Sequence, residues 1–227
     1  MKLLAVETST EACSAALIID GEVAERFELA PKEHTKLILP MIDSLMAEAG
    51  LSPQQLDGLA FSRGPGSFTG VRIATGVIQG IALGADLPVV SVSTLAALAQ
   101  DFFENNAQDA AFVAMDARME EIFWGVYRCD SAGYAELMGN EAVTPADLVD
   151  FPELLGVGIG SGWGVYSQEL MSRLVNRVSR YEAERLPRAK AIAKLGARGF
   201  ELGLAVPVEQ AMPVYLRDKV ARKESER

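Results

Sequence analysis

The chain has 227 residues, of which 49% are hydrophobic and 23% are charged. This composition excludes a disordered chain and a small disulfide-stapled module, because it supplies enough apolar side chains for a sizeable core. The net charge is −10, and an acidic chain binds phosphate backbones poorly by itself. The two cysteines, Cys13 and Cys129, form no C-x-x-C pair, and we find no signal peptide and no long uninterrupted apolar run. We therefore expect a soluble, cytoplasmic protein with reduced thiols and no membrane contact.

The charge is unevenly distributed along the chain. Residues 1–170 carry 8 basic and 24 acidic side chains, whereas residues 171–227 carry 13 basic and 7 acidic ones. An ordinary solvated helix face is the favoured interpretation of this basic segment, and a contact with RNA phosphates, made jointly with a more basic partner, is the alternative. The basic side chains concerned are Arg173, Arg177, Arg180, Arg185, Arg188, Lys190, Lys194 and Arg198.

The first half of the chain predicts three strands followed by alternating helices and strands. Asp20-Gly21 favours a tight hairpin between the second and third strands, and Gly50 is placed to end the first helix. Pro40 inside that helix predicts a kink or a late helix start. The expected strands span residues 2–6, 13–20, 23–29, 59–62 and 89–92, and the expected helices span 34–49, 69–83 and 94–103, with a short helix after Ser52-Pro53.

The second half repeats the opening of the first. An offset of 109 residues aligns 3–7 with 112–116 and 13–17 with 122–126, which places Glu7 on Asp116. A strand at 154–159 and helices at 166–175 and 187–202 follow. Two such halves resemble the two-lobed α/β fold of the actin-like ATPase (ASKHA) superfamily, a duplicated ribonuclease-H-like unit. We expect a first lobe at 1–105 and a second at 106–204, with the segment from about 205 packing back on the first lobe.

Glu7 and Asp116 are the candidates for catalysis. In an actin-like ATPase or a small-molecule kinase, one carboxylate on each side of a cleft would hold metal-bound phosphates. Phosphate loops of that kind place a glycine two positions after the acid, and here Ser9 and Arg118 stand there, so that side chains crowd the approach. ATP hydrolysis therefore remains the alternative and not the main prediction.

Two further features have ordinary structural interpretations. The loop at 63–72 is rich in glycine and precedes a helix, which suits an anion, but it matches neither a Walker loop nor a dinucleotide fingerprint. A tight connection whose glycines supply positive φ is favoured. His34 is the only histidine, and without a second histidine or a Gly-x-Ser-x-Gly elbow, metal and hydrolase chemistry are disfavoured. A helix-start or surface histidine is the favoured interpretation.

The helices at 34–49 and 69–83 predict an unusual surface. The first carries an apolar arc wider than one sheet-facing stripe requires, including two methionines. The second carries Gly76, Gly80 and Gly84 at four-residue spacing, each costing about 1 kcal/mol relative to alanine. Such a row lets another backbone approach closely. That backbone belongs either to the chain's own sheet or to another chain.

Several segments together resemble the bacterial TsaB (YeaZ-type) family of tRNA threonylcarbamoyladenosine biosynthesis proteins. The similar segments are Leu4-Ala5-Val6-Glu7-Thr8-Ser9, Glu33-His34-Thr35 with Leu39-Pro40, the loop from Gly64 to Arg72, Met115-Asp116-Ala117-Arg118 and Pro213-Val214-Tyr215-Leu216-Arg217. The resemblance implies a non-catalytic paralogue of TsaD, the metal-binding enzyme that transfers a threonylcarbamoyl group to A37, the adenosine beside the anticodon, of tRNAs reading codons that begin with A. The residue four places after His34 is Ile38, so the enzyme's His-x-x-x-His metal pair is missing.

The resemblance further implies a heterodimer with a TsaD-like paralogue, a TsaE-like ATPase that joins it, and a homodimer when the chain is alone. No cofactor is expected on this chain, because ATP and metal are expected on the partner proteins, and tRNA contact is expected only within the complex. Charge or bulk at Ile38, Met41, Val77 or Gly80 should abolish pairing while the chain stays folded. The expected interface residues are His34, Leu37, Ile38, Met41, Ile42, Leu45, Val71, Ile73, Val77, Gly80, Ile81 and Gly84.

Overall fold

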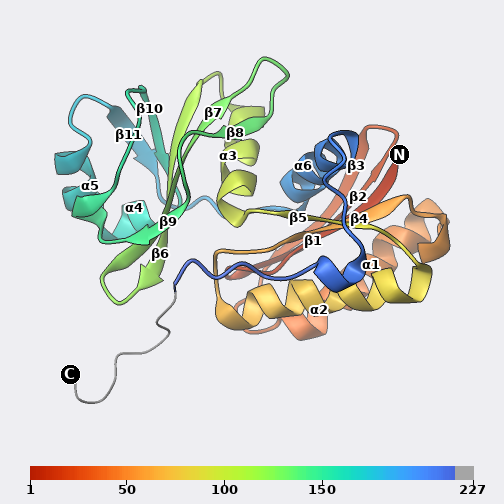
Figure 1. Cartoon of the computed structure of the whole chain (residues 1–227). Coiled ribbons are helices and arrows are strands. Elements are labelled where there is room, and N and C mark those ends of the chain that lie inside the picture. Colours follow the sequence, from red (N-terminus) through yellow and green to blue (C-terminus); the bar gives the residue numbers. More distant parts are fainter. Residues whose placement is uncertain (218–227) are drawn as a thin grey trace.

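The computed structural model describes residues 1–217, which form two lobes side by side, each with its own sheet (Figure 1). The sheet of the first lobe has the order β3-β2-β1-β4-β5. Its strands are β1 (Lys2–Glu7), β2 (Ala12–Ile19), β3 (Glu22–Leu29), β4 (Gly58–Ser62) and β5 (Val89–Val92). The hairpin partners β1, β2 and β3 are antiparallel, and β4 and β5 run parallel to β1. Asp20 and Gly21 form the predicted tight hairpin, both with positive φ.

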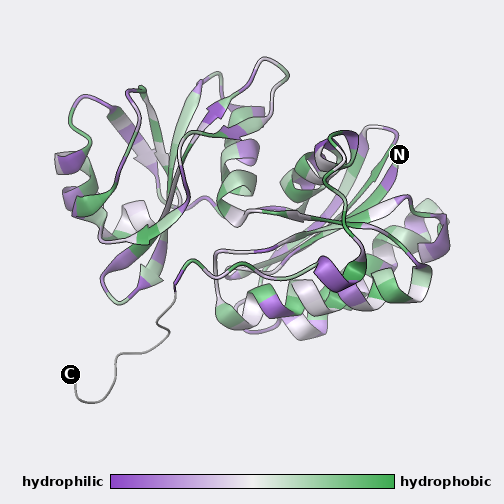
Figure 2. Cartoon of the chain, viewed as in Figure 1, coloured by the Kyte–Doolittle hydropathy of each residue, from purple (hydrophilic) through white to green (hydrophobic). Residues whose placement is uncertain are grey.

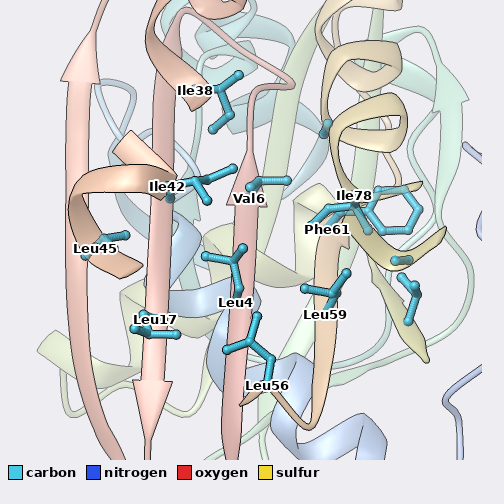
Figure 3. Close-up of a cluster of buried hydrophobic side chains, with 14 of the residues drawn as sticks. Leu4, Val6, Leu17, Ile38, Ile42, Leu45, Leu56, Leu59, Phe61 and Ile78 are labelled. Carbon is cyan, nitrogen blue, oxygen red and sulfur yellow. The ribbon is translucent and has the colours of Figure 1, made fainter. Parts of the chain in front are cut away.

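Two helices cover one face of this sheet, namely α1 (His34–Ala49) and α2 (Phe68–Ala85). Leucine, isoleucine and phenylalanine side chains from both helices and from β1, β2 and β4 form the core between them (Figure 3). Helix α1 begins at His34, so Pro40 does not delay its start. Gly50 ends α1 in the left-handed conformation. A short 3-10 helix, η1 (Pro53–Gln55), follows the predicted Ser52-Pro53 cap.

The second lobe has the sheet order β11-β10-β6-β7-β8, with β9 also paired to β7. Its strands are β6 (Ala110–Arg118), β7 (Glu121–Cys129), β8 (Ala135–Leu137), β9 (Ala142–Thr144), β10 (Gly156–Ile159) and β11 (Val178–Glu182). Helix α3 (Thr94–Asn105) lies on one face, and α4 (Gly162–Val165) and α5 (Ser167–Arg173) lie on the other. This lobe also contains the 3-10 helix η2 (Ala146–Leu148), whereas the 3-10 helix η3 (Val208–Gln210) packs on the first lobe.

The predicted duplication is present in the topology. In each lobe the first strand pairs antiparallel with the second and parallel with a later strand, β4 in one lobe and β10 in the other. Glu7 ends β1, and Asp116 lies near the end of β6. The chain therefore has the duplicated, two-lobed actin-like ATPase fold.

The packing corrects the expected division of the chain. Helix α6 (Ala189–Glu201), expected in the second lobe, packs on the free face of the first sheet, where Gly196 and Gly199 allow close approach to Ala60 and Val90. Helix α3, expected in the first lobe, packs mainly on the second sheet. A helix pattern shows which face is apolar but not which sheet receives that face, so the boundaries 1–105 and 106–204 do not follow the packing. The strands β8, β9 and β11 were not predicted.

Residues 205–217, which we call the C-terminal strap, run back along the first lobe. Val206 pairs with Val89 at the edge of the sheet, and Ala211 is fully buried beside α2. The Val214 N–H donates to the Arg63 carbonyl at 2.8 Å. The strap thus reaches the junction between the lobes.

Candidate functional site

Glu7 lies at the junction between the lobes and is fully buried. The Ser9 backbone N–H donates to its Oε1, whereas its Oε2 has no hydrogen-bond partner. Burial raises the pKa of the Glu7 carboxyl, although hydrogen bonding from Ser9 acts in the opposite direction. Burial of this kind disfavours the charged form of the carboxyl.

The matching acid, Asp116, is largely covered, with 13% of its side chain exposed. Its Oδ1 accepts the Arg118 backbone N–H at 2.9 Å, and its Oδ2 pairs with the Arg118 guanidinium at 3.0 Å. Arg118 therefore neutralises the carboxylate that a phosphate-bound metal would need. Among residues 1–217, no group of three or more His, Cys, Asp or Glu side chains is arranged to hold a metal ion.

The glycine loop before α2 is packed against the turn that follows β1. A Cβ at Gly66 would lie 2.5 Å from the Ser9 carbonyl oxygen, and one at Gly70 would lie 2.0 Å from that of Thr8. The Ser67 N–H donates to the Ser9 carbonyl at 2.7 Å, and the Thr8 hydroxyl donates to the Gly70 carbonyl at 2.7 Å. The loop is therefore a tight connection that approaches the chain's own backbone, as the favoured interpretation predicted, with positive φ at Gly64.

His34 starts α1 and is 8% exposed. Its Nε2 lies 2.8 Å from the Thr10 carbonyl oxygen and 3.1 Å from that of Ala12. An Nε2–H shared between these two acceptors ties the helix to the turn after β1. The imidazole is occupied in a structural role and is not presented to a substrate.

The expected interface residues fall into three groups. The first group is buried and consists of Ile38, Ile42 and Leu45, which lie in the core between α1, α2 and the sheet, together with His34 and Val71. These five side chains are covered within the chain itself, because an apolar arc seen in sequence does not show where the sheet contact ends. Their contact with a partner stays a prediction. The second group is half-buried along the two helices and consists of Leu37, Met41, Ile73, Val77 and Ile81. The third group, Gly80 and Gly84, is exposed.

The glycine row on α2 faces away from the chain. A Cβ at Gly76, Gly80 or Gly84 would meet nothing within 4 Å. The alternative that the row packs on the chain's own sheet is therefore wrong for these three residues. Exposed Leu39 on α1 and Leu83 on α2 add apolar area nearby. We call the half-buried second group, the three glycines and these two leucines the α1–α2 face. Figure 2 shows that hydrophobic and hydrophilic residues are mixed along helix α2 as a whole.

Helix α2 is also the one described helix that is long and apolar enough to cross a membrane by length and composition alone. Its buried side packs on the sheet of the first lobe, where Ala74, Ile78 and Ala82 are fully or nearly fully buried. The helix interior is interrupted by Arg72 and Gln79. The apolar side chains on one side of α2 therefore form part of the core of the first lobe.

The basic segment is mostly engaged in internal ion pairs. Arg185 and Lys190 pair with Asp101 of α3, and Arg188 pairs with Glu25 of β3. Four further ion pairs join Arg177 to Glu153, Arg180 to Glu182, Lys194 to Glu104 and Arg198 to Glu201. The Arg173 guanidinium donates to the Val149 carbonyl. These carboxylate and carbonyl partners engage the positive charge of the eight named side chains within the fold, and a contact of this segment with RNA stays an untested alternative.

Two arrangements at the junction were missed by sequence reasoning. The hydroxyls of Tyr127 and Ser93 both donate to Glu141, and burial beside this carboxylate raises the pKa of Tyr127. Arg217 of the strap pairs with Glu121 at 2.5 Å and donates to the Arg118 carbonyl at 3.3 Å. No spacing in the sequence signals these contacts, because they join segments that are distant along the chain.

Comparisons with known proteins agree closely with one another. A family model described as "TsaD: tRNA N6-adenosine threonylcarbamoyltransferase" matches residues 27–224. The chain is 42% identical over 227 residues to "tRNA threonylcarbamoyladenosine biosynthesis protein TsaB" of Escherichia coli, covering 98% of this chain and 97% of that protein. It is 34% identical over 111 residues to "tRNA N6-adenosine threonylcarbamoyltransferase" of Nitratidesulfovibrio vulgaris, covering 42% of this chain and 31% of that protein.

A solved structure, "YeaZ from Pseudomonas aeruginosa", superposes with a TM-score of 0.88 at 42% identity and covers 95% of this chain and 99% of that one. The agreement extends over both lobes. The two-lobed arrangement is therefore shared along almost the whole chain.

Proposed function

The chain belongs to the TsaB family of tRNA threonylcarbamoyladenosine biosynthesis proteins, and from this membership we propose that it is the non-catalytic partner of a TsaD-like paralogue. Its role lies in threonylcarbamoyladenosine modification of tRNA. In this proposal the paralogue transfers the threonylcarbamoyl group to the adenosine beside the anticodon, and this chain holds the paralogue in its active arrangement.

The α1–α2 face is the observation that carries the proposal. Glycines in the interior of α2 cost folding free energy, and the structure offers them no packing within residues 1–217. The cost is offset if a helix of another chain lies close along the row, because a glycine surface lets two backbones approach. The half-buried side chains of Leu37, Met41, Ile73, Val77 and Ile81 would then be covered together with the row.

The non-catalytic character is supported by the two acids. Glu7 is buried with a raised pKa, and Asp116 is paired with Arg118. Both features oppose the alternative of an ATPase or kinase that uses these two carboxylates. We therefore propose that this chain binds no cofactor of its own, and that ATP and metal belong to the partner proteins.

The same face supports two further associations. A homodimer through α1 and α2 is expected when the paralogue is absent, because the same apolar area needs cover. A TsaE-like ATPase is expected to join the heterodimer, and tRNA contact is expected only within that complex.

Because tRNA modification takes place on cytoplasmic tRNA, we expect the complex in the cytoplasm.

Reconstituted tRNA modification tests the proposal. The mixture contains the adenylate-forming enzyme with threonine, bicarbonate and ATP, together with TsaD, TsaE and tRNA, and this chain is included, omitted or replaced by Gly80→Arg. Modification should require the chain and fail with Gly80→Arg, whose long charged side chain blocks close approach although its Cβ has open space in the free chain. Ser172→Arg, at an exposed position on α5, is the matched control and should behave as wild type. Equal modification without the chain would refute the proposal.

A further inference from the structure

The exposed row on α2 does not consist of glycines alone. Phe68 and Arg72 precede Gly76, Gly80 and Gly84 at the same four-residue spacing. Residues at successive four-residue steps form a ridge that winds gradually around a helix and into which a crossing helix can pack. From Arg72 to Gly84 the row is about 18 Å long at 1.5 Å per residue. A helix that lies along the glycines therefore meets Arg72 and Phe68 at one end.

Arg72 lies against two aromatic rings whose centroids are 6.0 Å apart. Its guanidinium carbon lies 3.3 Å from the centroid of the Phe68 ring and 4.9 Å from that of Tyr215 in the C-terminal strap. Its Nη1 donates to the Phe68 carbonyl at 3.1 Å. The guanidinium is thus fixed in place while Phe68 and Tyr215 remain 54% and 47% exposed. We call these three residues the arginine stack.

The arginine stack carries a positive charge that no carboxylate among residues 1–217 neutralises. Most arginines of this acidic chain pair with a carboxylate, whereas Arg72 has no such partner among the residues that the structure describes. A guanidinium presents a planar fork of N–H donors that fits a carboxylate with two hydrogen bonds. Charge complementarity therefore points to an acidic group arriving from outside.

The surroundings distinguish a protein carboxylate from an RNA phosphate. The row continues from Arg72 into glycines bordered by the half-buried side chains of Ile73 and Val77, and not into further basic residues. Affinity for RNA rests on several Lys and Arg contacts to phosphates, whereas an apolar surface with an arginine and aromatic anchors is typical of protein interfaces. The observations favour a protein.

We propose that the arginine stack is the polar end of the α1–α2 face and receives an Asp or Glu side chain of the TsaD-like paralogue. The inference rests on the proposed function and names the chemistry of one contact within it. It also brings the strap into the interface, because Tyr215 lies 143 positions after Arg72 in the chain and forms one wall of the stack. The tail segment then contributes directly to partner recognition.

The affinity of this chain for the purified paralogue, measured by calorimetry at several salt concentrations, tests the proposal. Arg72→Gln should weaken binding about tenfold or more and flatten its salt dependence, because one charged pair is lost. Tyr215→Ala should weaken binding in the same direction by releasing the guanidinium. Arg198→Gln is the matched control, since Arg198 also lies over a tyrosine ring but on α6, on the other side of the first sheet.

The outcomes separate this inference from the proposed function. If wild type does not bind the paralogue, the proposed function fails. If wild type binds and Gly80→Arg does not, while Arg72→Gln binds as tightly as wild type, the pairing stands and the carboxylate contact is refuted. If Arg72→Gln binds the paralogue normally but lowers retention of tRNA by the complex, the stack contacts RNA and the proposal is also refuted.

Discussion

Glu7 shows how the surroundings of one residue decide its chemistry. Its position at the end of β1 is the position at which an actin-like ATPase holds a catalytic carboxylate, and the sequence alone allowed that role. In the folded chain the carboxyl is fully buried and accepts the Ser9 backbone N–H. Burial raises its pKa, so the residue has the environment of a neutral core group.

Replacing Glu7 with Gln should raise the stability of the chain at neutral and alkaline pH. A raised folded pKa means that the unfolded chain loses this proton first, so wild type loses stability as the pH rises above the unfolded value near 4.5. Glu7→Gln has no such proton to lose and retains an acceptor for the Ser9 N–H. Urea unfolding of both proteins between pH 4 and pH 8 measures the difference, which should widen with pH.

Glu22→Gln, at an exposed position of β3, is the control and should show no such widening. The result would contradict the interpretation if wild type were the more stable protein at pH 8. Loss of tRNA modification by a stable Glu7→Gln protein would instead support the ATPase alternative.

At the scale of the element, helices α1 and α2 each divide into a side that holds the fold and a side that is available to a partner. Ile38 is 1% exposed and packs in the core shown in Figure 3, whereas Met41, one turn further along α1, is half-buried. Because Ile38 packs in the core, we expect a charge there to destabilise the chain. Loss of pairing without unfolding stays the prediction for Met41.

A matched pair of variants tests this division. Ile38→Asp should lower the free energy of unfolding by several kcal/mol, about 2–5 from lost packing alone, because it also buries a charge. Met41→Asp should leave the free energy of unfolding within about 1 kcal/mol of wild type and prevent pairing with the paralogue. Urea unfolding and size-exclusion chromatography with the paralogue measure the two effects. Equal destabilisation by both variants would show that the two sides are not separate.

At the scale of the whole molecule, the C-terminal strap joins the two lobes. It is bound to the first lobe through Val206 and Val214, and Arg217 reaches the turn between β6 and β7 in the second lobe. That turn contains Arg118, Met119 and Glu120, all with positive φ, which is strained for residues other than glycine. The ion pair of Arg217 with Glu121 and its hydrogen bond to the Arg118 carbonyl join the strap to this strained turn.

Arg217→Ala should therefore loosen the turn between β6 and β7. Loss of a charge-assisted contact worth about 1.4 kcal/mol corresponds to roughly tenfold faster hydrogen exchange at residues 117–122, with the core strands unchanged. Arg128→Ala, which removes an ion pair with Glu136 inside the second lobe, is the control. Hydrogen–deuterium exchange with mass spectrometry measures both, and unchanged exchange at the turn would show that the strap does not support it.

The sequence by itself determined the elements that local pattern controls. Strands and helices of the first lobe, the stop at Gly50, the Asp20-Gly21 hairpin and the duplicated start of the second lobe all follow from periodicity, turn chemistry and self-similarity. These signals are local, or repeat at a constant offset, and can be read without knowing which elements touch. The family resemblance likewise depended on short segments.

Only the tertiary structure decided which sides of those elements are covered. It placed α6 on the first sheet, buried five of the expected interface residues, left the glycine row of α2 open and brought Tyr215 and Arg217 of the strap to Arg72 and Glu121. Periodicity gives the width of an apolar face but does not show which element packs against it. Contacts between segments that are distant in the sequence produce no regular spacing from which they could be predicted. The candidate partner surface consists of those residues of α1 and α2 that do not pack in the core of the first lobe.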